Sequence, residues 1–139
     1  MNSLFIVWSD DFNSGVLILD EQHRGLVSLI NSFFFHRGDS DGNIMRILVP
    51  TIEMFKSYAK INFLTVEKLM RDSAYPDLEK YEKIHDEMME AIERIDRQCR
   101  SRRDVPALLE FLKNYWLDTI KGKDHDYIKY FHEFYGESI

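Results

Sequence analysis

The stretch TIEMFKSYAKINFLTVEKLM, residues 51–70, decides the fold. Its apolar residues return every three or four positions, which is the spacing of one face of an α-helix. Extended in both directions, this stripe contains Ile44, Ile47, Leu48, Thr51, Met54, Phe55, Tyr58, Asn62, Thr65 or Val66, and Leu69. The pattern predicts a helix over about 43–71, and it places the amide of Asn62 on an apolar face.

Three further segments have the same period, and turn residues separate them. The predicted helices cover about 19–35, 43–71, 77–99 and 105–121. Asp104 is a candidate N-cap for the last of them. Residues 1–18 lack a helical period and predict an extended arm with Trp8 as an apolar anchor, while a short helical segment follows Gly122. We therefore expect one all-α domain over residues 1–139, an up-down-up-down four-helix bundle with this arm and a short C-terminal helical segment.

Composition and charge exclude several classes of protein. The chain has 139 residues, the size of one ordinary domain, and its net charge of −6 argues against a nucleic-acid partner. Its first residues lack the basic and apolar regions of a signal peptide, and no segment predicts membrane insertion, so we expect a cytoplasmic location. The single cysteine, Cys99, excludes an internal disulfide, and its polar surroundings predict an exposed thiol.

Each predicted helix carries polar residues where a plain bundle would use Leu or Ile. These are His23, Asn62, Tyr81 with His85, and Thr119. In antiparallel neighbours their positions would meet at one end of the bundle, and four-helix bundles build metal sites from such inward-facing side chains. Core residues that are hydrogen-bonded locally are the alternative interpretation.

Four stretches also resemble one known family in order and spacing. They are VWSDDFNSGVLILDEQHRGLVSLIN (7–31), NFLTVEKLM (62–70), YPDLEKYEKIH (75–85) and TIKGKDHDYIKYF (119–131). Over nearly its whole length the chain resembles the bacterial hemerythrins, which are oxygen-binding di-iron four-helix bundles. That family holds two irons with five histidines, one glutamate and one aspartate.

The resemblance implies a degenerate site, because only three of the seven ligand positions keep the family's residue. The retained positions are His23, His85 and Asp124. The substituted positions are Asn62, Tyr81 and Thr119, which stand at histidine positions, and Val66, which stands at the position of the bridging glutamate. Valine cannot bridge metals, so we expect no di-iron site.

The expected cofactor is therefore none, with a single iron or zinc ion as the alternative. Without metal, the polar residues would hydrogen-bond one another, with a buried water as a further partner. Glu67 follows the vacated bridging position, but one helical residue turns it about 100° away.

No nucleophile–base spacing or acid/base pair indicates an enzyme. We expect a non-enzymatic, degenerate hemerythrin-like module that acts by binding another protein or as a signalling component, with self-association as a further option. A metal or oxygen sensor with a reduced site is the first alternative. An intact oxygen- or iron-binding bacteriohemerythrin is the second.

Aromatic residues supply candidate interaction surfaces. The stretches SFFFHR (32–37) and DYIKYFHEFY (126–135) contain more rings than one helix face can bury. Surplus rings form exposed patches that bind partners, or else they thicken the core. The candidate interaction residues are Phe34, Phe35, Tyr130, Phe131 and Phe134.

Overall fold

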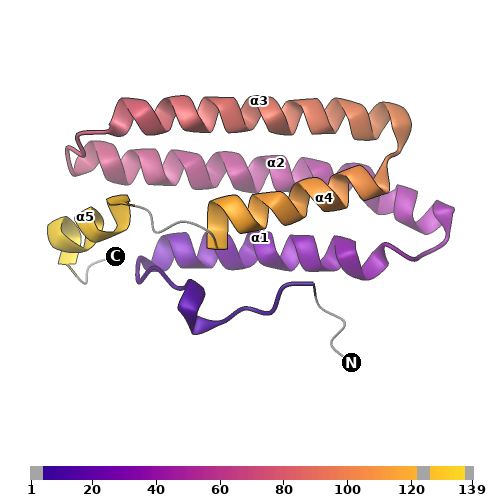
Figure 1. Ribbon diagram of the computed structural model, residues 1–139, viewed down its shortest axis with the longest axis horizontal. Coiled ribbons are helices and arrows are strands. Elements are labelled where there is room, and N and C mark those ends of the chain that lie inside the picture. The colour runs from indigo at the N-terminus through magenta and orange to yellow at the C-terminus, as the bar shows by residue number, and fades with distance from the viewer. Residues whose placement is uncertain (1–4, 122–125, 137–139) are drawn as a thin grey trace.

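The computed structural model describes residues 5–121 and 126–136. This part of the chain is helical throughout apart from its arm and turns, which confirms the all-α bundle (Figure 1). The four long helices are α1 (Leu17–His36), α2 (Asp41–Asp72), α3 (Leu78–Arg102) and α4 (Val105–Tyr115). The shorter elements are η1 (Asp10–Phe12), the π-helix η2 (Trp116–Lys121) and α5 (Asp126–Tyr135). Each long helix packs against the next, and α4 also contacts α1.

Local chemistry explains where the helices begin and end. The helix α1 starts inside the predicted arm, because the buried Asp20 carboxylate accepts hydrogen bonds from the backbone N–H groups of Ser14 and Gly15. At the start of α4, Asp104 accepts from the N–H of Ala107, so this predicted N-cap is confirmed. The helix α3 runs three residues further than predicted and ends where Arg103 adopts a left-handed φ of 53°.

The buried face of α2 differs from the predicted stripe. Its buried apolar residues are Ile44, Leu48, Ile52, Phe55, Ala59, Phe63, Val66 and Met70. Met54 and Tyr58, which belong to the predicted stripe, are 48% and 37% exposed. The helix lies between α1 and α3 and packs on both, so the face it buries is rotated away from these two residues.

The N-terminal arm packs along α1 through aromatic rings and one side-chain amide. The Trp8 ring lies 5.7 Å from Phe12 and 6.5 Å from Trp116, so it anchors the arm as expected. The Asn31 side chain accepts a hydrogen bond from the N–H of Ile6 and donates another to its carbonyl oxygen, at 2.8 and 2.7 Å.

The short helix α5 covers the end of the bundle, where α1 begins and α2 ends (Figure 1). Its Phe131 is fully buried and packs with Val16 and Met70. Tyr130 is half-buried, and its hydroxyl donates to the carbonyl oxygen of Ser73 at 2.6 Å. The prediction that Phe131 belongs to an interaction surface is therefore wrong, and Tyr130 is engaged in docking α5.

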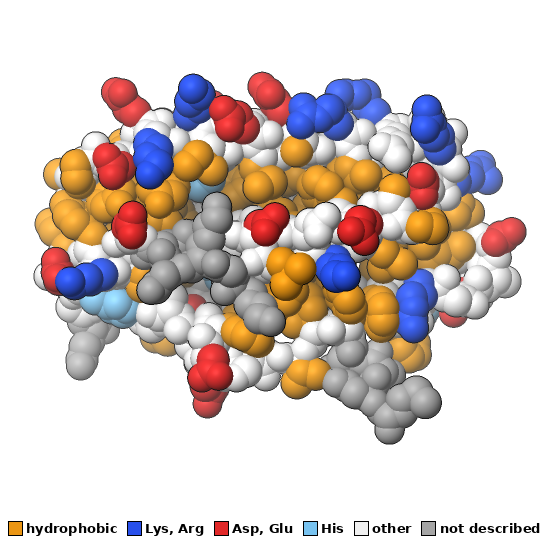
Figure 2. Space-filling model, viewed as in Figure 1, with side chains coloured by type: hydrophobic (Ala, Val, Ile, Leu, Met, Phe, Trp, Pro, Cys, Tyr) orange, Lys and Arg blue, Asp and Glu red, His pale blue; other side chains and the backbone are white. Residues whose placement is uncertain are grey.

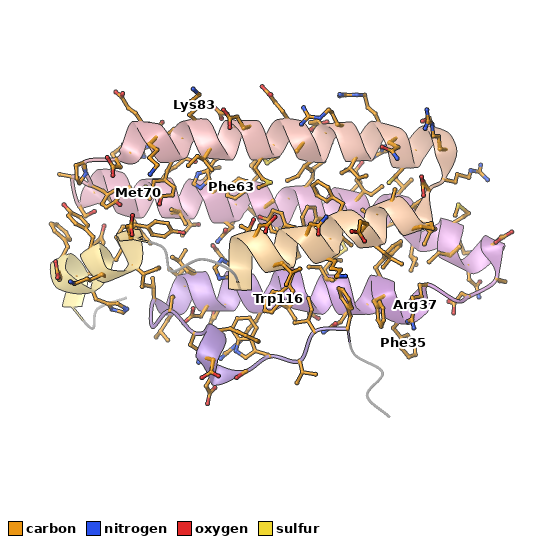
Figure 3. The ribbon with its side chains drawn as sticks, viewed as in Figure 1. Phe35, Arg37, Phe63, Met70, Lys83 and Trp116 are labelled. Carbon is orange, nitrogen blue, oxygen red and sulfur yellow. The ribbon has the colours of Figure 1, made fainter. Side chains whose placement is uncertain are left out.

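The other aromatic candidates, at the end of α1 and on α5, differ in their exposure. Phe34 is half-buried, and its ring stacks on Phe5 at 4.7 Å. Phe35 points away from the bundle and is 61% exposed (Figure 3). Phe134 on α5 is 56% exposed. Only Phe35 and Phe134 of the five candidates present most of their ring to solvent.

Cys99 is buried, so the predicted exposed thiol is wrong. The residues around it belong to the last turns of α3, where Arg97, Arg100 and Arg102 are exposed while Cys99 lies in the core. Burial raises the pKa of this thiol to about 11.

Ionic contacts join α2 to α3. Asp96 on α3 is almost fully buried and binds Lys56 of α2 at 2.8 Å and Arg100 one turn along α3. Glu93 adds a second carboxylate to Lys56, and Arg100 also reaches Glu53 of α2. Figure 2 shows other charged side chains gathered along α3 above a band of apolar side chains. Among the described residues, no helix is long and apolar enough to cross a membrane.

Candidate metal centre

One pocket brings together the polar residues that the sequence singled out. Its volume is about 250 Å³. His23 of α1, Asn62 and Val66 of α2, Tyr81 and His85 of α3, and Thr119 of η2 all line it. Asp124, the seventh predicted position, lies outside the described residues. Six positions from four helical elements therefore converge on one cavity inside the bundle.

The remaining wall is mostly apolar, with charge at its edge. Phe63, Ile84, Met88 and Tyr127 line the pocket, and they are joined by Lys80 and Asp118. The last two residues are exposed, which places both charges at the mouth. Asp118 and Thr119 reach the pocket from the π-helical segment, a geometry that is rare and is often found at functional sites.

Asn62 is held by a hydrogen-bonded chain between α2 and α1. Its side-chain nitrogen donates to Gln22 Oε1 at 2.8 Å, and Gln22 Nε2 donates to Thr65 Oγ1 at 2.9 Å. Thr65 in turn donates to the carbonyl oxygen of Ile61. The Asn62 amide is therefore hydrogen-bonded as a core polar group, which fits the alternative interpretation of the polar residues.

His85 is held by two residues of α2. Its Nδ1 lies 2.9 Å from Glu67 Oε2, and the Phe63 ring stacks on the imidazole with centroids 4.3 Å apart and planes 7° from parallel. Figure 3 labels Phe63 on α2, beside α3. The 100° rotation per residue that takes Glu67 off the pocket wall brings it to His85.

Burial sets the protonation of the pocket. Desolvation lowers the pKa of His85 by more than the hydrogen bond with Glu67 raises it. Burial also raises the pKa of Tyr81 and of Tyr127. Near neutral pH the pocket therefore holds a neutral imidazole at His85 and protonated phenols.

Sequence reasoning missed several residues of this site. Gln22 and Tyr127 gave no periodic signal that distinguishes them from ordinary helix residues. Lys80 sits one residue before Tyr81, and its ammonium lies 5.6 Å from the centre of that ring. The helical period predicts that Glu67 points away from the pocket wall. Its contact with His85 could not be predicted, because that contact depends on how α2 packs against α3.

Inward-facing imidazole, phenol and amide groups on neighbouring helices are the way helical bundles build ligand and metal sites. A family model described as the hemerythrin HHE cation binding domain matches residues 14–131. The chain therefore belongs to the hemerythrin family.

Individual relatives agree with this assignment. A bacteriohemerythrin of Pseudomonas aeruginosa is 29% identical over 125 residues, covering 88% of this chain and 79% of that protein. A bacteriohemerythrin of Stenotrophomonas maltophilia is 25% identical, with 88% and 78% covered. A myohemerythrin of Theromyzon tessulatum is 26% identical over 120 residues, with 86% and 88% covered.

These matches correct the expectation that the chain has no cofactor. The family model describes a cation-binding domain, and the bacteriohemerythrin relatives point to a di-iron cofactor. The substituted ligand positions had led us to expect that no metal remained. That expectation was wrong, because the family to which the chain belongs is described by a cation-binding domain.

The donors present decide how such a cofactor fits. In the described residues, two imidazoles, from His23 and His85, and the Tyr81 phenol face one cavity. Val66 supplies no donor, and no three His, Cys, Asp or Glu side chains of these residues gather as a metal-binding group. Nitrogen and phenol oxygen donors fit one zinc or ferric ion, whereas the described set is too small for two irons.

Proposed function

We propose that this protein is a non-catalytic sensor module that binds a single metal ion in the pocket of His23, Tyr81 and His85. The observation that carries the proposal is the convergence of these three donors, from α1 and α3, on one cavity of about 250 Å³. The family membership supports a cation as the ligand. The substitution of Val66 for a carboxylate supports one ion in place of a bridged pair.

Such a site would bind a metal ion without catalysing a reaction. Coordination positions of the ion that the protein does not fill could exchange small ligands. The chain's own donors would hold the ion, and the apolar wall of the pocket would exclude water from that side. Lys80 and Asp118 flank the mouth, where a small molecule would enter. We propose a cytoplasmic protein that reports the presence of metal or of such a small ligand.

Metal content tests this proposal. We expect purified protein reconstituted with Zn²⁺ or Fe³⁺ to retain one ion per chain after desalting, measured by elemental analysis. His85→Ala should lose most of the bound metal, because it removes one of two imidazoles. His36→Ala is the matched control, since this exposed histidine lies outside the pocket and pairs with Asp39. Two irons per chain with oxo-bridged absorption bands would overturn the single-ion assignment, and no retained metal would overturn the site.

A second candidate function is protein interaction, in which a partner protein or a second copy binds exposed aromatic rings. Phe35 and Phe134 favour it, because each exposes more than half of its surface although it is large and apolar. We expect Phe35→Ser or Phe134→Ser to reduce capture of a partner in a pull-down without changing thermal stability. Unchanged capture by both variants would count against these surfaces. Analytical ultracentrifugation of the same variants would separate self-association from binding to another protein.

A further inference from the structure

We infer that Glu67 is a positioning residue, which fixes the tautomer and direction of His85 so that Nε2 is the nitrogen presented to the pocket. Glu67 holds His85 from α2, across the interface with α3, through the 2.9 Å contact between Oε2 and Nδ1. Both side chains are largely buried, at 15% and 11% exposure. A hydrogen bond in such surroundings is shielded from competition with water.

The direction of this hydrogen bond follows from the chemistry of the two groups. An ionised carboxylate only accepts hydrogen bonds, so the proton between the groups belongs to His85 Nδ1. In a neutral imidazole the other nitrogen, Nε2, then carries the lone pair that binds metals. The contact therefore selects one of two tautomers.

The position of the ring supports the same assignment. His85 lines the pocket, whereas Glu67 is absent from its wall. The Nδ1 edge is therefore turned away from the cavity, and the opposite edge is turned toward it. Stacking on Phe63 fixes the plane of the ring, so its face and one edge are both constrained. A carboxylate behind a ligating histidine is a common means of orienting it.

This assignment gives a role to a carboxylate that lies beside the pocket. Val66 leaves the pocket without an acid on α2, and the acid that follows it acts from behind the imidazole. Glu67 does not replace the missing bridge. It orients His85, one of the proposed metal donors. The inference therefore rests on the proposed function of the pocket.

Tautomer measurement tests the inference in metal-free protein. We expect long-range ¹H–¹⁵N spectra of protein with ¹⁵N-labelled histidine to show His85 protonated at Nδ1. Glu67→Ala should shift it toward the Nε2–H form, because the acceptor is gone. Glu79→Ala is the matched control, an exposed acid of α3 outside the pocket, and should leave the spectrum unchanged. An Nε2–H tautomer in the wild type, or an unchanged tautomer in Glu67→Ala, would overturn the inference.

Metal titration provides the second readout. Glu67→Ala should bind Zn²⁺ about 10–100-fold more weakly than wild type, the usual effect of losing such a partner. Circular dichroism would show whether the variant folds, and Glu67→Leu, which has a similar volume but no acceptor, would take its place if it does not. Absence of zinc binding by the wild type would overturn the proposed metal site, while the tautomer would still decide the role of Glu67. Equal affinity of wild type and folded variant would overturn that role.

Discussion

Replacing Phe55 by alanine is expected to lower the free energy of unfolding by about 3–5 kcal/mol, the usual cost of removing a large buried ring. Phe55 is 1% exposed in the main core. Its ring contacts Tyr115 at 4.8 Å and Phe111 at 6.0 Å, so it joins α2 to α4. The truncation would remove both contacts and leave a cavity between two helices.

Urea unfolding followed by circular dichroism would measure this change. Phe35→Ala is the matched control, since it makes the same truncation at a ring that is 61% exposed. We expect the control to change the free energy of unfolding by less than about 0.5 kcal/mol. A Phe55→Ala variant as stable as Phe35→Ala would contradict the packing of α4 on α2.

The second large effect is expected at Asp96. Asp96→Asn should cost about 2–3 kcal/mol, below the 3–5 kcal/mol typical of a broken buried ion pair. The expected cost is smaller because neither cation loses its last partner: Lys56 still pairs with Glu93, and Arg100 still pairs with Glu53. The control is Asp72→Asn, which removes an exposed carboxylate paired with Lys68 and should cost at most about 1 kcal/mol.

The shifted pKa of Asp96 also leads us to expect that the free energy of unfolding depends on pH. Burial raises the pKa of its carboxyl, but hydrogen bonds from Lys56 and Arg100 lower it by more, so the folded-state pKa is below the usual value. A depressed carboxyl pKa stabilises the fold above the unfolded pKa of about 4, and this stabilisation is lost as the pH falls through the folded value. Urea unfolding at pH 7 and pH 3 should show a smaller difference for Asp96→Asn than for wild type. Equal differences would exclude Asp96 as a source of acid sensitivity.

Much of the fold could be predicted because helical periodicity is a local property. The four long helices lie close to their predicted positions, and Asp104 caps α4 as its sequence suggested. The buried face of α2 was predicted less well at Met54 and Tyr58, which are apolar but exposed. Periodicity finds the apolar face of a helix, and the neighbouring helices decide which part of that face is covered.

The same distinction applies to the candidate site, where some residues could be found from the sequence and others depend on how the helices pack. The family motif located His23, Asn62 and His85, which the structure places around one pocket. It could not indicate Gln22 or the partnership of Glu67 with His85, because both depend on the rotation of one helix against another. The π-helical geometry at Trp116–Lys121 was also missed, since the period of that segment resembles an α-helix.

The docking of α5 has a consequence for synthesis of the protein on the ribosome. Tyr127 lines the pocket, and Phe131 belongs to the apolar cluster beside it. The other members of that cluster include Leu19 of α1 and its N-cap Val16, which come more than a hundred residues earlier. During synthesis the first helices therefore leave the ribosome with this apolar surface exposed. It is covered only after the residues around Phe131 have been made. A nascent chain that stalls within α4 exposes this apolar end of the bundle, and such exposed surface makes folding intermediates prone to aggregation.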